Sequence, residues 1–191
     1  LNSIQHLITE SEKDKALRYL SKFSKLIRLI LKNASKNTNT IAEELKILEY
    51  YLDLEALRFS PRFSYHFDID SKLNIDMIEI PSILLQPFVE NALVHGLLHK
   101  ETAGFLEISM RISGAHLQCS ITDNGIGREA ALIIQQQKGL HHDSLALQLS
   151  TERITMLEKI SNKQLSIDIQ DLKNEQGAIL GTKVYIEIPL D

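Results

Sequence analysis

Residues 84–98 read LLQPFVENALVHGLL and combine an apolar helical face with a small polar patch. Glu90, Asn91 and His95 lie within one helical turn of each other, with residues 91 and 95 at i,i+4 spacing. An amide oxygen and a carboxylate are ligands that Mg²⁺ accepts while it keeps several waters. Glu90 could instead polarise an attacking hydroxyl or imidazole. Taken alone, the patch is more typical of a solvated helix face than of a site.

A second motif, DNGIG at residues 123–127, follows a segment with the alternating pattern of a strand. Gly125 and Gly127 permit positive φ and a close approach of the backbone to a ligand. Asp123, at the end of the strand, can accept a hydrogen bond from an exocyclic amine. An Asp-Asn-Gly sequence alone is more often only a turn. The occurrence of both motifs, first on a helix and then at a strand end, favours a ligand site.

The segments around these motifs predict alternating helices and paired strands. Strands are expected at residues 62–69, 105–112, 117–122, 165–169 and 182–188, and helices at 82–99, 129–137 and within 144–160. Pro87 lies early in the first of these helices, so it must start or bend the helix. The order predicts an α+β sandwich in which one mixed sheet carries helices on one face.

The chain up to Phe59 has a different composition and periodicity: it contains no glycine or proline, and its apolar residues recur at a spacing of three and four. It predicts two amphipathic helices joined by the polar residues 32–39, with Thr40 and Glu43 as a capping box for the second helix. The stripe of the first helix contains Leu17, Leu20, Ser24, Ile27 and Leu31, with Phe23 and Ile30 beside it. Because a hairpin cannot cover both apolar faces, we expect dimerisation; packing on its own domain alone is the alternative.

Length, cysteine content and charge limit the function classes. The 191 residues suit one domain, or one domain with an appendage, and the single cysteine, Cys119, excludes a disulfide framework and a multi-cysteine zinc site. We expect Cys119 to be a small buried core residue. The net charge of −4 disfavours a broad nucleic-acid-binding face. Residues from Pro61 onward carry 11 basic and 17 acidic side chains, so an anionic ligand there needs backbone dipoles and a divalent cation.

The motifs resemble those of a known family. Residues 85–92 with His95-Gly96 resemble the N-box of LytS/YehU-type sensor histidine kinases, and residues 123–127 resemble the G1 box of the same GHKL (Bergerat) ATP-binding fold. Residues 181–184 resemble the closing strand of that fold, and residues 1–5 the end of the H-box. The resemblance implies a dimerisation-type helical hairpin over residues 1–60 and a GHKL ATP-binding catalytic domain over residues 61–191.

The resemblance also implies roles for single residues, with ATP and Mg²⁺ as cofactors. On the phosphate side, Asn91 would be the Mg²⁺ ligand, Glu90 the acid that orients or activates the acceptor, and His95 a group close to the phosphates.

On the base side, Asp123 would bind the adenine amine and Thr182 would assist it. Gly125 and Gly127 would let the loop close over the base.

By the same resemblance, the chain is the cytoplasmic-side catalytic part of a two-component sensor histidine kinase whose full-length form sits in the inner (plasma) membrane. It would form a homodimer through its N-terminal helices and pass phosphate to a response regulator of the LytTR type, with no direct contact to nucleic acid. The chain opens on Leu1 rather than methionine, so we expect a piece of a longer protein. The phosphoacceptor histidine is expected about six residues upstream of Leu1, which would leave this piece inactive in autophosphorylation.

Two departures from the family pattern define the alternative. Val94 stands where the family often has lysine, and Ala146 stands where the lid usually has glycine. Both are consistent with a degenerate ATP-binding signalling module that does not transfer phosphate.

Overall fold

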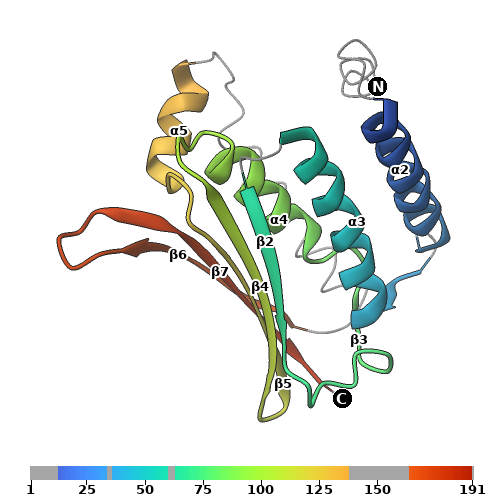
Figure 1. The fold of residues 1–191 in the computed structure, drawn as a ribbon. Helices are drawn as coiled ribbons and strands as arrows, with labels where there is room; N and C mark the ends of the chain where they lie inside the picture. The colour runs from blue at the N-terminus through green and yellow to red at the C-terminus, as the bar shows by residue number, and fades with distance from the viewer. Residues whose placement is uncertain (1–12, 34–35, 60–62, 138–163, 191) are drawn as a thin grey trace.

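The computed structural model describes residues 13–33, 36–59, 63–137 and 164–190, and these form one mixed sheet with helices on one face (Figure 1). The sheet has five strands in the order β2-β4-β5-β7-β6, with β2 parallel to β4 and every other neighbouring pair antiparallel. The strands are β2 (Phe63–Ile69), β4 (Gly104–Ser113), β5 (His116–Asp123), β6 (Ser166–Lys173) and β7 (Ile179–Pro189). The predicted α+β sandwich is confirmed.

Alternation along the central strands explains why they form a sheet with one buried face. Alternate side chains of β4 and β5 enter the core over residues 106–110 and 117–121, and Cys119 is 1% exposed, as expected for a core residue. The helical side of the same core comes from α3 (Ile41–Phe59) and from the helix that carries the polar patch. The fully buried residues of this core, from helices and strands together, include Ile41, Leu48, Leu52, Val89, Leu93, Leu106, Ile108 and Ile186.

The N-terminal hairpin consists of α2 (Lys13–Asn33) and α3, and the two helices lie side by side (Figure 1). Leu26 of α2 packs on Ile47 and Leu54 of α3, while the opposite face of α3 lies in the main core. The predicted capping box is confirmed, because the Thr40 amide donates to Glu43 Oε2 and the Glu43 amide donates to Thr40 Oγ1, both at 3.2 Å.

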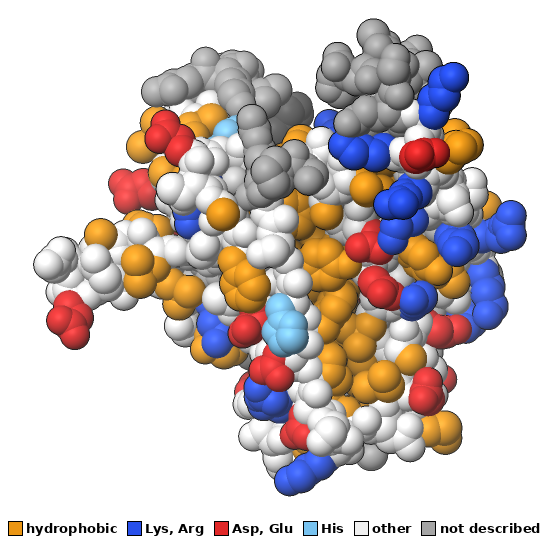
Figure 2. All heavy atoms as spheres, in the orientation of Figure 1, with side chains coloured by type: hydrophobic (Ala, Val, Ile, Leu, Met, Phe, Trp, Pro, Cys, Tyr) orange, Lys and Arg blue, Asp and Glu red, His pale blue; other side chains and the backbone are white. Residues whose placement is uncertain are grey.

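The outer face of α2 remains exposed. The predicted stripe lies there, and its members are exposed: Leu17 (64%), Leu20 (41%), Ser24, Ile27 (39%) and Leu31 (69%). Of the two residues expected beside it, Phe23 is 43% exposed, whereas Ile30 is partly buried against the Leu26 cluster. Lysine and arginine side chains gather beside this stripe (Figure 2). In the described part of the chain, one face of the hairpin packs on the sheet domain and the other face is exposed. The hairpin therefore packs on its own domain, and dimerisation through the exposed face stays a prediction.

Two features between α2 and the polar patch differ from the prediction. The residues that join α2 to α3 include a short strand, β1 (Thr38–Thr40), which pairs antiparallel with β3 (Glu79–Pro81). The helix expected at residues 82–99 begins only at Gln86, as α4 (Gln86–Asn91), with Pro87 in its first turn, and continues as the π-helix η1 (Ala92–Leu97). Pro87 therefore starts the helix rather than bending it.

The other predicted helix in the described part is α5 (Arg128–Gln137), which confirms the helix expected at 129–137. The helix expected within 144–160 lies outside the described residues. Among the helices that are described, none has the length and apolarity that a bilayer crossing requires.

Leu48 tests whether α3 is part of the structural core of the sheet domain. Because Leu48 is fully buried in the main core, Leu48→Ala should lower the free energy of unfolding by about 2–5 kcal/mol. Urea titration measures this value. Met77→Ala, at a side chain that is 75% exposed, is the matched control and should change stability by less than about 0.5 kcal/mol. Equal effects of the two substitutions would contradict the assignment of α3 to the core.

Candidate functional site

The turn after β5 holds a buried carboxylate. Asp123 is 5% exposed, and its Oδ1 accepts a hydrogen bond of 2.8 Å from the Gly125 amide. The β5–β7 register places Thr182 opposite Asp123, and the Thr182 amide also donates to the carboxylate. The structure therefore brings together Asp123, Gly125 and Thr182, as the sequence predicts.

A backbone contact joins this turn to the helix with the polar patch. A Cβ atom on Gly125 would lie 2.6 Å from the Gly96 backbone and 2.6 Å from Asp123 Oδ1, and one on Gly96 would lie 2.9 Å from that oxygen. The Ile126 amide donates to the Gly96 carbonyl at 3.4 Å. Glycine is required at both positions because any side chain would push η1 away from the turn.

The backbone conformation of the two motif glycines differs from the prediction in one respect. The sequence permits positive φ at both Gly125 and Gly127, but of the two only Gly127 has it, with φ of +79°. Gly125 is needed for close approach alone. Sequence reasoning missed a role for Gly181, whose φ is +148° and whose Cβ would lie 1.9 Å from the Asp123 carbonyl oxygen. Its position before Thr182 in the GTK sequence was the available signal.

Lys100 supports the turn from outside. Its Nζ donates to the Asn124 carbonyl at 2.5 Å, and Asn124 Oδ1 in turn accepts from the Phe105 amide at 2.7 Å. The lysine charge also lowers the pKa of Asp123. Desolvation by burial is the larger effect and raises the pKa of Asp123 to about 6.

The polar patch is less compact than the i,i+4 spacing predicts. Asn91 is exposed, whereas Glu90 and His95 are half-buried. Asn91 ends α4, and η1 is closed by i→i+5 bonds such as the Leu98 amide to the Leu93 carbonyl at 2.9 Å. Residues four apart no longer lie directly above each other across such a wide turn. Burial lowers the pKa of His95, and the nearby His99 lowers it further, so a neutral imidazole is favoured.

Glu90 lies close enough to α3 to interact electrostatically with two of its residues. Its Oε1 accepts a hydrogen bond of 2.6 Å from Gln86 Nε2. Burial raises the pKa of Tyr51 and of Glu55 on α3, and the negative charge of Glu90 raises both further. The Arg58 guanidinium, whose Nη1 lies 3.5 Å from Glu55 Oε2, partly offsets this rise in the pKa of Glu55. Sequence reasoning missed Glu55 because nothing local links the hairpin to the polar patch.

The donor set fits a magnesium ion that is shared with a phosphate. Within the described ranges, no group of three or more His, Cys, Asp and Glu side chains could hold a metal by itself. The exposed Asn91 amide is a single oxygen ligand, and Mg²⁺ commonly binds to one or two protein groups together with substrate phosphates and waters. The buried Asp123 carboxylate is the group that would accept a hydrogen bond from the amine of a base. Ala146 of the expected lid lies outside the described residues.

The fold has a solved counterpart. The mycobacterial sensor histidine kinase MprB superimposes with a TM-score of 0.51 at 15% sequence identity, over 80% of this chain and 95% of that structure. This likeness shows that the chain shares the fold of that structure.

Sequence comparison identifies the family of the chain more narrowly than the fold does. The family model described as "Histidine kinase" matches residues 1–63. The sensor protein LytS of Oceanobacillus iheyensis is 34% identical over 139 residues, or 72% of this chain and 23% of that protein. LytS of Staphylococcus haemolyticus is 32% identical over 127 residues, or 66% of this chain and 21% of that protein. The chain is a relative of the LytS-type sensor histidine kinases, which confirms the recognition made from the motifs.

The raised pKa of Asp123 predicts a pH-dependent stability. Between the ordinary pKa of 3.8 and about 6, the folded protein binds more protons than the unfolded chain, so this carboxyl lowers stability as pH rises through that window. The Asp123→Asn variant has no such proton, and its unfolding free energy should rise relative to wild type by about 2 kcal/mol between pH 4 and pH 7. Urea titrations of both proteins across this pH range measure the difference.

Asp171 provides a control of opposite sign. Its hydrogen bond with Arg128 lowers its pKa, so Asp171 adds stability that is lost as pH falls. The difference in stability between wild type and Asp171→Asn should therefore shrink toward low pH. A flat difference between wild type and Asp123→Asn from pH 4 to pH 7 would contradict the raised pKa.

Proposed function

We propose that the chain is the ATP-binding catalytic part of a two-component sensor histidine kinase that binds Mg-ATP between the Asp123 turn and the α4–η1 helix. The single observation that carries the proposal is the buried Asp123 carboxylate pressed against the glycine backbone of that helix. The chain spans 21–23% of the length of the two LytS relatives, so the activity of the whole protein is part of the proposal.

On the base side, Asp123 accepts a hydrogen bond from the exocyclic amine of adenine. The Gly125 and Thr182 amides hold the carboxylate in place, so its acceptor geometry is set before the ligand arrives. In this proposal, Gly125 and Gly127 let the loop close over the base, since neither has a Cβ that would hold the loop away from its neighbours. Thr182 is half-buried opposite Asp123 and assists it.

On the phosphate side, Asn91 offers its amide oxygen to Mg²⁺, and His95 donates a hydrogen bond toward the phosphates as a neutral imidazole. Bound Mg²⁺ supplies the positive charge that an acidic domain lacks and orients the terminal phosphate. Glu90 orients or activates the acceptor imidazole, and Gln86 fixes the position of its carboxylate. The acceptor is a histidine upstream of Leu1, and an aspartate of a response regulator, proposed to be of the LytTR type, receives the phosphate next.

The hairpin supplies the dimer contact in this proposal, and residues 1–60 and 61–191 are its two functional units. The basic and apolar outer face of α2 is suited to a second copy of the same helix. The assembly would lie on the cytoplasmic side, attached to the inner membrane by segments outside this chain, and would make no direct contact with nucleic acid.

A degenerate module that binds ATP without phosphotransfer is the second candidate. Val94, 43% exposed, leaves the phosphate side without the lysine that many members of the family have. Joining the upstream histidine segment to this chain and measuring phosphotransfer separates the two candidates. Tight Mg-ATP binding without transfer would favour the module.

Asn91 tests the metal role. Asn91→Ala should weaken Mg²⁺-dependent ATP binding by more than about tenfold, because loss of a ligand costs at least as much as loss of a group that supports one. Titration calorimetry with and without Mg²⁺ measures this. Gln118→Ala, at an exposed residue that bonds to Glu187 on the sheet, is the control and should bind as wild type. Unchanged affinity in Asn91→Ala would remove the metal role, and equal binding of ATP and GTP by wild type would remove the role of Asp123.

The exposed stripe of α2 tests the dimer. Leu31→Glu places a charge in the proposed apolar contact, so it should convert a dimer into a monomer. Sedimentation equilibrium measures the mass. Met77→Glu changes an equally exposed apolar side chain outside the hairpin and should leave the dimer intact. A wild-type chain that is monomeric at all concentrations would contradict the proposal.

A further inference from the structure

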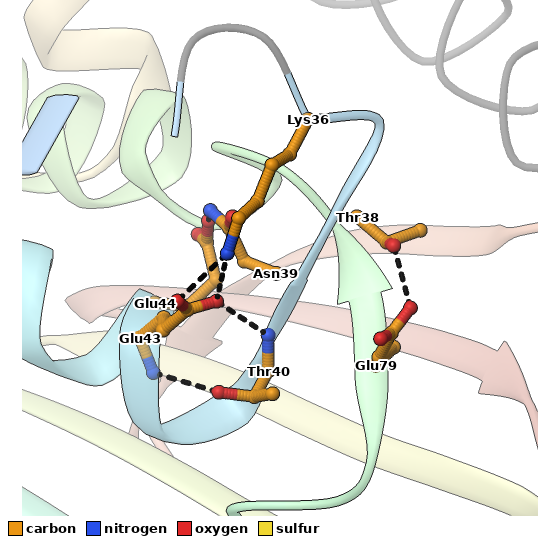
Figure 3. Close-up of polar contacts among 7 residues, drawn as sticks. All are labelled: Lys36, Thr38, Asn39, Thr40, Glu43, Glu44 and Glu79. Atoms are coloured by element: carbon orange, nitrogen blue, oxygen red, sulfur yellow. Dashed lines mark hydrogen bonds and ion pairs between the residues drawn. The ribbon is translucent and has the colours of Figure 1, made fainter. Parts of the chain in front are cut away.

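Glu44 is a buried carboxylate that ties the hairpin to the segment before α4. It lies in the first turns of α3 and is 1% exposed. Its Oε1 accepts one hydrogen bond from Asn39 Nδ2 and one from the Ile83 amide, both at 2.7 Å. The first bond stays within the hairpin, as Figure 3 shows at the start of α3, whereas the second reaches the chain that leads to α4.

Ile83 has an unusual backbone conformation. Its φ is +60°, and among the described residues it is the one non-glycine residue with positive φ. A β-branched side chain in the left-handed region is unfavourable, so the conformation persists only where the surroundings impose it. The Glu44 carboxylate holds the Ile83 amide at this point.

Ile83 lies shortly before α4, so the hydrogen bond between Glu44 and the Ile83 amide acts close to the start of that helix. The antiparallel pairing of β1 with β3 ends with Thr38 opposite Pro81, and the Ser82 amide still reaches the Asn37 carbonyl at 3.0 Å. Glu44 then holds the next residue along the chain. Two buried leucines follow, and α4 begins at Gln86 without a side-chain cap. The turn at Ile83 therefore sets how the chain enters the helix that carries Glu90 and Asn91.

The structure assigns Glu44 a positioning role. We propose that the Glu44 carboxylate, by holding Ile83 in the left-handed conformation, sets the placement of α4 and couples any shift of the α2–α3 hairpin to Glu90 and Asn91. This inference rests on the proposed function, since it names a residue that supports the proposed phosphate side. It does not make Glu44 a catalytic residue, because Glu44 acts through Ile83 and the start of α4.

The neighbouring Glu43 offers a matched comparison. It belongs to the same turn of α3, but its carboxylate bonds to Lys36 Nζ at 2.8 Å and to the Thr40 amide, both within the hairpin (Figure 3). Removal of its charge therefore affects the helix cap alone. Glu44 differs from Glu43 in being buried and in its contact with the segment before α4.

The experiment compares Glu44→Gln, Glu43→Gln, Ile83→Gly and the double variant Glu44→Gln/Ile83→Gly in this chain. Hydrogen exchange measures protection of residues 83–91 and, as an internal reference, of β7. Calorimetry measures the affinity for Mg-ATP. Glycine adopts positive φ without strain, so Ile83→Gly makes the turn independent of the carboxylate.

Glu44→Gln should reduce protection at residues 83–91 by about tenfold, the scale of a charge-assisted hydrogen bond, while β7 stays unchanged. It should also weaken Mg-ATP binding by about threefold or more. Glu43→Gln should leave protection at residues 83–91 and the affinity for Mg-ATP unchanged. In the Ile83→Gly background, the additional effect of Glu44→Gln should largely disappear, which is the signature of a residue that acts through its neighbour.

Three outcomes would overturn the assignment. They are an equal loss of protection in residues 83–91 and in β7, an equal effect of Glu43→Gln on α4, and an effect of Glu44→Gln that is as large in the Ile83→Gly background as in the wild-type chain. The exchange measurement needs no nucleotide. If wild type binds no Mg-ATP, the proposed function fails while the tie between Glu44 and α4 is still tested by exchange.

Discussion

The rest of the site depends on the contact between two glycine backbones, Gly96 at the end of the patch helix and Gly125 in the turn after β5. No side chain fits between them, because a Cβ on either residue would lie within 3 Å of backbone or carboxylate atoms. The contact brings the helix to the end of the central strand β5 and closes Asp123 off from water. It also accompanies the π-helical turn, since the Gly96 carbonyl points to the Ile126 amide of the turn after β5.

Burial of Asp123 has an electrostatic consequence. A carboxylate that loses water must be compensated by hydrogen bonds or by a charge, and here two backbone amides and the more distant Lys100 do so only in part. The folded protein therefore keeps an acceptor that is fixed in place and whose charged form is disfavoured by burial. Such a group is unfavourable for stability and favourable for a ligand that brings a hydrogen-bond donor, which is the chemistry of an exocyclic amine.

Local patterns predicted the elements, whereas contacts between distant segments produced the differences. Alternation located the strands, and Thr40 with Glu43 located the start of α3, because both signals depend on near neighbours. Apolar spacing cannot distinguish an α-helix from one that widens into a π-helix where Gly96 meets the turn. The late start of α4 follows a residue with positive φ, Ile83, and an isoleucine gives no sequence signal for positive φ.

The hairpin shows why one segment can serve both structure and signalling. One face of α3 completes the core through Leu48 and Leu52, and the other face holds α2 through Ile47. Asp53 strengthens this link, because it pairs with Lys22 of α2 and accepts a hydrogen bond of 2.7 Å from Tyr65 Oη of β2. A functional boundary near residue 60 would therefore cut through one hydrophobic core, because that core contains residues of α3 and of the sheet. A helix packed this way cannot move without moving its contacts, so a displacement at the open face of α2 has a direct physical route to the sheet and to the helix that carries the polar patch.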